Sequence, residues 1–301
     1  MFHPFSNPSV PAILATLTLF ACPKTCPGAT TPAGTTPTSP PPLSTAAPVA
    51  ATYAIKISPD WKVGQKFGYV ADDHSITADG EDDIHFDADG EVLALLPSGN
   101  PQRLAYTVKA LKVTGADFPK AKLPVAGSKI VIEFAADNKK RVTIDGKAAD
   151  PDTADFLAEV LWITIRNHTD QEIYGPKAPV AIGASWPINA AAFLDSHDEG
   201  DSHYDSISGS LTLQSVDGAS DAQLAVVSGN LTAKGQSPPS DPGSFADQLK
   251  FTASAPINHH GVFKEIMNST TTFTPPPSLS SLLAGGASTV KETVTQVITM
   301  P

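Results

Sequence analysis

The chain has 301 residues, 20 lysines and arginines against 31 aspartates and glutamates, and a formal net charge of −11 at pH 7. A nucleic-acid-binding protein would present a basic face, so this acidic composition argues against that class. The two cysteines both lie before residue 27, so the rest of the chain must be stabilised by packing rather than by disulfide bonds.

The first predicted element is an export signal over residues 1–21. The mostly apolar run at residues 10–21 is too short to span a bilayer, which needs about 20 residues. It is typical of the apolar core of a signal peptide, with the small residue Ala21 at the cleavage point. Residues 19–22 read Leu-Phe-Ala-Cys and resemble the bacterial lipobox. That resemblance implies that Cys22 is acylated and anchors an exported protein to a membrane of the bacterial cell envelope.

Residues 22–52 are predicted to be a disordered tether. Eight of the residues between 23 and 52 are proline, and Lys24 is the only charged one. Such a segment cannot bury enough apolar surface to offset its conformational entropy. At about 3.1 Å per residue it could reach roughly 90 Å from the membrane. Anionic lipid headgroups would also repel the acidic module that follows.

The module at residues 53–301 is predicted to be mainly β. Residues 128–134 and 141–145 alternate apolar and polar side chains on either side of a polar turn, which is typical of a hairpin. The same signals predict two more hairpins, which pair 92–96 with 104–113 and 210–216 with 223–233. Residues 289–300 are rich in Thr and Val and are expected to form a closing strand.

One buried helix is expected between these strand sets. Asp150 can cap its first turn, Pro151 suits the first helical position, and the apolar residues between 156 and 165 follow helical spacing. The breadth of this apolar face predicts that the helix packs against a sheet.

Three short motifs recur along the module at offsets of 118 to 120 residues. The shared forms are apolar-Gly-x-x-aromatic-x-apolar, Asp-x-His-aromatic-Asp, and a Leu-Ala pair. They match residues 63–69 with 182–188, 83–87 with 201–205, and 103–106 with 223–226. The pattern favours two related halves, 53–175 and 176–301, although chance similarity among short β motifs would give the same matches.

The repeated Asp-x-His-aromatic-Asp motif is the candidate metal site. On a strand, its two Asp and one His share a face, and two such strands brought together would offer ligands for zinc or another divalent ion. The residues concerned are Asp83, His85, Asp87, Asp201, His203 and Asp205. The alternative is a set of solvated side chains, because no Cys or HExxH pattern accompanies them. The Walker A, G-x-S-x-G and G-x-G-x-x-G motifs of catalytic and nucleotide sites are absent as well.

The whole arrangement is similar in kind to lipoproteins of the LolA/LppX type. The lipobox, the long antiparallel strands and the single apolar helix carry that resemblance. It implies a curved antiparallel sheet or open barrel that wraps one buried helix and holds lipid in its concave face. We therefore expect a non-catalytic module that binds an apolar or amphipathic ligand in the curve of the sheet. The aromatic residues expected to line such a site are Trp61, Phe67, Tyr69, Phe156, Trp162 and Trp186. Their alternative role is to form the core.

Two other functions remain open at this point. One is a structural or protein-interaction module of the envelope with no small-molecule pocket. The other is a metal-binding protein or a metal-dependent hydrolase, which requires that the strands bearing His85 and His203 lie close enough to share an ion.

Overall fold

The protein is described here by a computed structural model, in residues 50–78, 80–115, 122–134, 140–161, 168–197, 203–219, 223–236, 243–257, 261–275 and 288–301. Strands dominate it. The first half contains β1 (Thr52–Tyr53), β2 (Lys66–Ile76), β3 (Glu81–Leu95), β4 (Pro101–Thr114), β5 (Lys129–Phe134), β6 (Lys140–Ile144) and β7 (Lys147–Ala148). The helices are α1 (Pro151–Val160), α2 (Asp170–Tyr174) and α3 (Ala190–His197). The second half contains β8 (Val180–Ala181), β9 (Ser185–Pro187), β10 (His203–Asp217), β11 (Leu224–Gln236), β12 (Ser244–Pro256), β13 (Gly261–Thr274) and β14 (Ser288–Met300).

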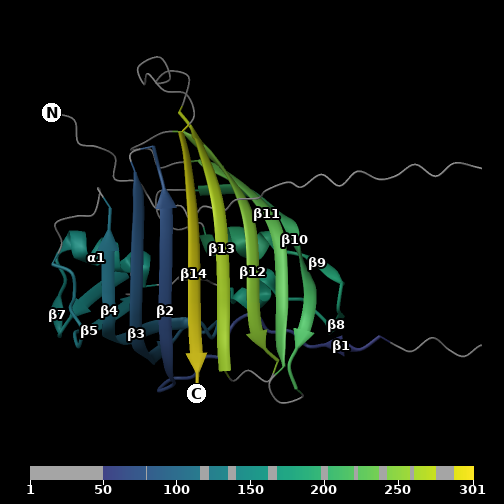
Figure 1. Cartoon of the computed structure of the whole chain (residues 1–301), viewed down its shortest axis with the longest axis horizontal. Coiled ribbons are helices and arrows are strands. Elements are labelled where there is room, and N and C mark those ends of the chain that lie inside the picture. The colour runs from purple at the N-terminus through teal and green to yellow at the C-terminus, as the bar shows by residue number, and fades with distance from the viewer. Residues whose placement is uncertain are drawn as a thin grey trace, which may run out of the picture.

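Twelve of these strands form one antiparallel sheet, in the order β7-β6-β5-β4-β3-β2-β14-β13-β12-β11-β10-β9 (Figure 1). The sheet is curved and is not closed into a barrel, so its two edges are the short strands β7 and β9. The mainly β fold predicted from the sequence is therefore confirmed. From β2 the chain adds strands one by one until it reaches the edge at β7. It then crosses to the opposite edge at β9 and adds strands one by one back to the centre at β14. The central pairing of β2 with β14 consequently joins the two ends of the module.

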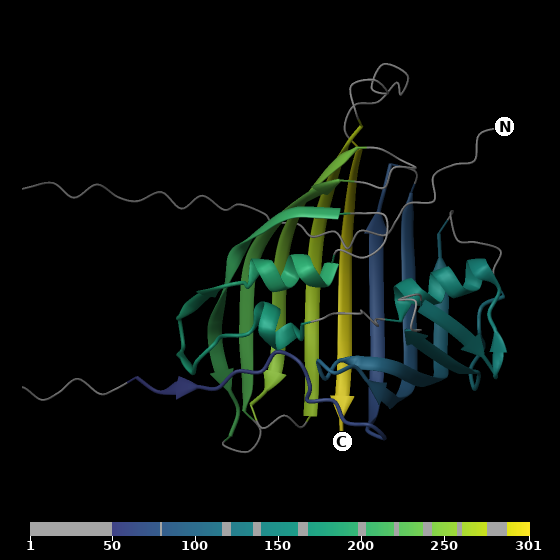
Figure 2. The same ribbon diagram turned by 180° about the vertical axis from the view of Figure 1, so that it is seen from behind.

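Within the described residues, three helices lie on the concave face of the sheet, where a single helix was expected (Figure 2). Helix α1 begins as predicted, because the Asp150 side chain accepts a hydrogen bond from Thr153 N at 3.1 Å and Pro151 follows the cap. It ends at Val160, earlier than the apolar pattern suggests. No helix in the described part of the chain is both long enough and apolar enough to cross a membrane.

The concave face carries two separate hydrophobic clusters. Their composition follows from strand alternation, which sends every second side chain of each strand toward the helices. The first cluster packs α1 through Phe156 and Leu157 against the inner side chains of β2 to β6. The second packs α2 and α3 through Ile173 and Phe193 against those of β9 to β12.

The N-terminal segment links the two clusters along one end of the sheet (Figure 2). It starts with the pairing of β1 and β8, which involves only two residue pairs. Ile55 and Ile57 are then buried in the second cluster, and the Trp61 ring lies 5.1 Å from the Phe67 ring in the first. We refer to residues 52–65 as the strap.

The recurring motifs fall on corresponding strands. The first motif lies at β2 and at β9, the second on β3 and at the start of β10, and the third on β4 and at β11. Counted along the chain, β2 to β7 and β9 to β14 are two meanders of equal strand number, and the last strand of one pairs with the first strand of the other. Two related halves remain a prediction, and this strand order supports it.

Candidate functional site

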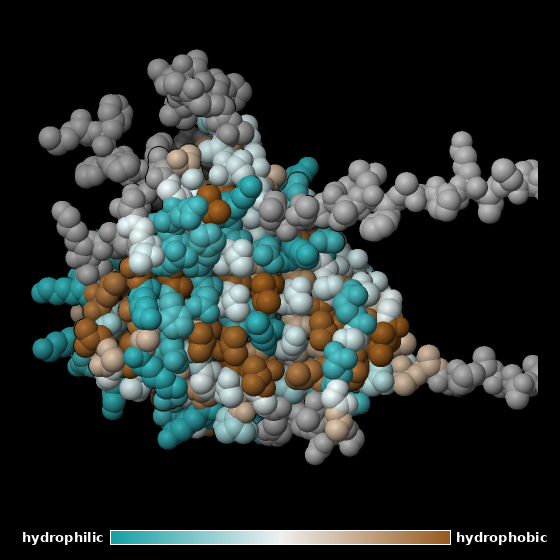
Figure 3. All heavy atoms as spheres, viewed as in Figure 1, coloured by the Kyte–Doolittle hydropathy of each residue, from teal (hydrophilic) through white to brown (hydrophobic). Residues whose placement is uncertain are grey.

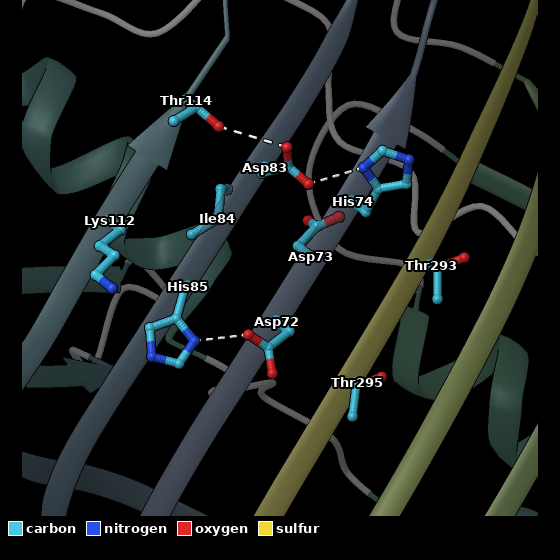
Figure 4. A pocket seen from close by; sticks show the side chains of 10 residues that line it. All are labelled: Asp72, Asp73, His74, Asp83, Ile84, His85, Lys112, Thr114, Thr293 and Thr295. Atoms are coloured by element: carbon cyan, nitrogen blue, oxygen red, sulfur yellow. Dashed lines mark hydrogen bonds and ion pairs between the residues drawn. The ribbon is translucent and has the colours of Figure 1, made fainter.

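A polar groove of about 400 Å³ opens on the convex face of the sheet, opposite the helices (Figure 4). It crosses β2, β3, β4 and β14 at the level of the predicted His85. Its lining consists of Asp72, Asp73, His74, Asp83, Ile84, His85, Lys112, Thr114, Thr293 and Thr295. Ionisable side chains from three neighbouring strands, β2, β3 and β4, meet in this groove.

Strand alternation places the ionisable side chains of the groove. In β2, Phe67, Tyr69 and Ala71 are buried toward the helices on the concave face. Asp72 and His74 stand at the alternate positions, so their side chains point to the convex face. The register of β2 and β3 sets Asp72 opposite His85 and His74 opposite Asp83. Each strand therefore contributes one Asp and one His in reciprocal order.

Both cross-strand pairs are hydrogen-bonded (Figure 4). His85 Nδ1 lies 2.6 Å from Asp72 Oδ1, and His74 Nδ1 lies 2.8 Å from Asp83 Oδ1. Thr114 Oγ1 donates to the second carboxylate oxygen of Asp83 at 3.4 Å. All four paired side chains are at least one-third exposed. The two His–Asp pairs therefore satisfy one another and still remain accessible to a polar ligand.

The arrangement of the rings does not favour a metal ion. Each imidazole uses Nδ1 for its carboxylate partner, and the two Nε2 atoms point to opposite sides of the groove (Figure 4). Within the described ranges, no group of three or more His, Cys, Asp or Glu side chains is placed to hold a metal ion. The pairing instead fixes the orientation of both rings on the sheet surface.

The structure does not bring together the two strands that would share the predicted metal ion. Asp83, His85 and Asp87 lie on β3, whereas His203 and Asp205 lie at the start of β10. Five strands separate β3 from β10 in the sheet, which corresponds to about 29 Å at about 4.8 Å per strand step. Asp201 lies outside the described residues.

The remaining members of these motifs have local partners. Asp87 is 3.8 Å from Lys109 Nζ, which also lies 2.6 Å from Asp89. The hydrogen bond to Asp89 is the main reason that the pKa of Lys109 is raised. On β10, His203 Nε2 lies 3.9 Å from Asp205. These contacts are those of solvated surface pairs, which contribute little to stability.

The predicted aromatic ligand site does not form one cavity. Trp61, Phe67, Tyr69 and Phe156 belong to the first hydrophobic cluster, while Trp186 belongs to the second. Trp162 lies outside the described residues. Tyr69 Oη donates to Val160 O at 3.3 Å, and Trp186 Nε1 donates to Tyr174 O at 2.7 Å. The described aromatics therefore lie in or against the hydrophobic core, and the polar atoms of Tyr69 and Trp186 bond to the backbone.

A second candidate site, missed by the sequence interpretation, lies on the concave face. Asp247 of β12 is fully buried, and its Oδ1 atom has no hydrogen-bond partner. Tyr204 Oη lies 3.4 Å from the other carboxylate oxygen. Burial raises the pKa of Asp247 to about 6, against the opposing effect of the nearby Thr271 and Tyr204 hydroxyls. Ser269 of β13 is also buried, and its Oγ atom lacks a partner.

The sequence does contain a signal for this buried carboxylate. Phe245, Leu249 and Phe251 alternate as inward residues of β12, and Asp247 stands at an inward position of the same series. A charged residue at a core position of a strand is costly unless something compensates for it. Such a position therefore identifies a candidate binding site rather than a surface residue.

Comparisons with known proteins assign no relative to this chain. No family model matches it, and no curated protein and no solved structure is similar to it at a significant level.

Proposed function

We propose that this protein is a membrane-tethered lipoprotein of the bacterial cell envelope that binds an amphipathic ligand on the concave face of its sheet, without catalysis. The observation that carries the proposal is the buried polar site at Asp247 and Ser269, whose Oδ1 and Oγ atoms have no hydrogen-bond partner. A buried polar atom without a partner costs roughly 1–3 kcal/mol, so a ligand that supplies the missing partner would gain affinity there.

The surroundings suit a ligand with both an apolar and a polar part. Asp247 pairs across the sheet with Thr271, and the adjacent inward pair is Leu249 with Ser269. Leu249 and Phe251 of the same strand belong to the second hydrophobic cluster. Hydrogen-bonding and apolar groups thus alternate along one inner surface, which is what most small-molecule sites combine.

The resemblance to LolA/LppX-type lipoproteins points the same way. Such a resemblance implies a curved antiparallel sheet with helical structure against its concave face and a lipid bound there. The tether predicted at residues 22–52 would hold such a module at a distance from the membrane.

Native mass spectrometry of the full chain, purified gently from membranes, tests this proposal. We expect an added mass of several hundred daltons that is lost on denaturation, whereas a covalent lipid at Cys22 would remain. Asp247→Asn should lower the occupancy, and Asp89→Asn, which changes a charge on the convex face, should not. An apo mass for the native protein, or equal occupancy in both variants, would contradict the proposed site.

A further inference from the structure

The convex face of β11 to β14 has an electrostatic character opposite to that of the whole chain. Lys234, Lys250, Lys264 and Lys291 stand one on each of these strands, and all four are exposed. At the outward positions of β11 to β14 as described, there is no Asp or Glu. A basic surface on a chain of net charge −11 calls for a physical account.

Strand alternation separates the charges of β12 to β14 between the two faces. The acidic residues of these strands are Asp247, Glu265 and Glu292, and the register places each in line with inward side chains. Glu265, for instance, pairs with Gln296 in the row next to the buried pair Phe263 and Ile298. The lysines occupy the alternate positions and therefore point away from the core.

The lysines lie among neutral hydrogen-bonding side chains. One cross-strand row contains Asn230, Lys250 and Asn268, and the next contains Gln248 and Lys291. Figure 3 shows hydrophilic and neutral side chains over the upper half of the convex face, whereas hydrophobic ones gather in its lower half. We call the surface formed by Lys234, Lys250, Lys291, Asn230, Gln248 and Asn268 the lysine surface.

We propose that the lysine surface binds an acidic polysaccharide. The lysines complement carboxylate or phosphate groups, and the Asn and Gln amides can both donate to and accept from sugar hydroxyls. A flexible polymer can follow a convex surface, whereas a flat membrane would touch it only along a line. Since Phe245, Phe251 and Phe263 are all buried toward the concave face, the described strands offer no outward aromatic ring to insert into lipid or to stack on a neutral sugar.

The lysine surface lies on the opposite face of the sheet from the proposed amphipathic-ligand site. An experiment can therefore disprove binding at either site without affecting the other. The test uses the full chain and immobilised polygalacturonate, with neutral dextran as the reference polymer. We expect saturable binding to polygalacturonate at 50 mM salt that weakens by at least about tenfold at 200 mM, since about three charge contacts are screened. Dextran should not bind.

A matched pair of variants separates the lysine surface from net charge. The triple change Lys234→Gln, Lys250→Gln and Lys291→Gln should weaken binding at least about tenfold. The control is Lys66→Gln, Lys129→Gln and Lys147→Gln, which removes the same charge from β2, β5 and β7 and should leave binding within about twofold. Equal losses in the two variants would overturn the proposal.

Two further outcomes would also overturn it. Stronger binding to vesicles containing phosphatidylglycerol than to polygalacturonate would assign the surface to lipid headgroups. Light scattering could instead show that the protein dimerises as its concentration rises and that the triple variant does not. That result would assign the lysine surface to contact with a second copy of this chain, through the acidic groove region.

Discussion

Gly64 and Gly183 hold the same position in two hydrogen-bonded turns of matching form. Both have positive φ, at 80° and 85°. The N–H of Gly64 donates to Val92 O at 2.8 Å, and that of Gly183 donates to Leu213 O at 2.8 Å. The following residue completes each turn. The carbonyl of Gln65 accepts a hydrogen bond from Val92 N at 2.9 Å, and the carbonyl of Ala184 accepts one from Leu213 N at 3.1 Å. The two meanders therefore repeat a local structure as well as a sequence motif, which supports a duplication.

Replacing either glycine by alanine should destabilise the module by about 1 kcal/mol. The physical reason is backbone strain alone, because a Cβ at Gly64 or Gly183 would meet no atom within 4 Å. Urea unfolding of Gly64→Ala and Gly183→Ala measures the loss. Gly68→Ala is the control, since a Cβ there would make an ordinary contact at 3.6 Å with Thr299. Similar stability for all three variants would contradict the prediction.

Gly90 permits a close ring contact in the first hydrophobic cluster. It pairs with Phe67 across β2 and β3, and a Cβ on Gly90 would overlap the Phe67 ring. Gly90→Ala should therefore lower the free energy of unfolding by about 1–3 kcal/mol.

A double-mutant cycle identifies the cause of that loss. Phe67→Leu alone removes ring contacts, including one with Tyr106 at 5.9 Å, but it also frees the space above Gly90. The double variant Phe67→Leu and Gly90→Ala should thus be less destabilised than the sum of the single variants. Additive losses, measured by the same denaturation, would mean that the ring is not the obstacle.

The buried Asp247 should make stability fall as pH rises from about 4 to about 6. Its pKa is about 6 in the folded protein against 3.8 ordinarily, so the folded state binds the proton more tightly. The stability contributed by protonated Asp247 is fully present below about pH 4, is lost as the pH rises to about 6, and is absent at higher pH. Burial is the main cause of this rise in pKa, and the hydroxyls of Thr271 and Tyr204 oppose it.

Asp247→Asn should remove this pH dependence. At pH 8 the variant should be more stable than the unchanged protein by up to about 3 kcal/mol, which corresponds to the pKa rise at about 1.4 kcal/mol per pH unit. Thermal unfolding between pH 4 and 8 measures the effect, and Asp89→Asn should leave the profile unchanged. A variant less stable at pH 8 would show that the carboxylate is compensated in the folded protein.

Cys22 should carry the membrane anchor. In a bacterial host, Cys22→Ser should abolish labelling of the protein by palmitate and move it from the membrane fraction to the soluble one. Cys26→Ser removes the other cysteine four residues later and should leave both labelling and fractionation unchanged. Palmitate labelling that survives in Cys22→Ser would disprove the lipobox interpretation.

Local patterns predicted the hairpins well, because a strand and its turn lie within one short stretch of sequence. Residues 128–134 and 141–145 correspond to β5 and β6, and residues 289–300 correspond to β14. The pairing of β14 with β2 could not be predicted in this way, since no turn connects them and their register depends on the whole sheet. Helix α2 was missed because it has only five residues, although Thr169 and Glu172 form a capping box at its start.

The candidate site was predicted in part, for a similar reason. Single-strand spacing identified His85, but the residues that contact it lie on the neighbouring strand. Asp72 and His74 lie as far before the end of β2 at Ile76 as His85 and Asp83 lie after the start of β3 at Glu81. This symmetry is the sequence signal for the two reciprocal pairs. The proposed duplicate at His203 was misleading, because similar strands of two successive meanders are necessarily far apart in one sheet.

The strap has a mechanical consequence for a tethered protein. A pulling force applied at residue 50 would first act on the two residue pairs between β1 and β8. It would next extract Ile55 and Ile57 from the second cluster, and Trp61 from the first, before any load reached β2. Because β2 lies in the middle of the sheet, the strap would yield under tension while the twelve strands stay paired. If Cys22 anchors the chain as proposed, the strap would be a short extensible segment in series with that anchor, and it would protect the sheet from forces transmitted by the membrane.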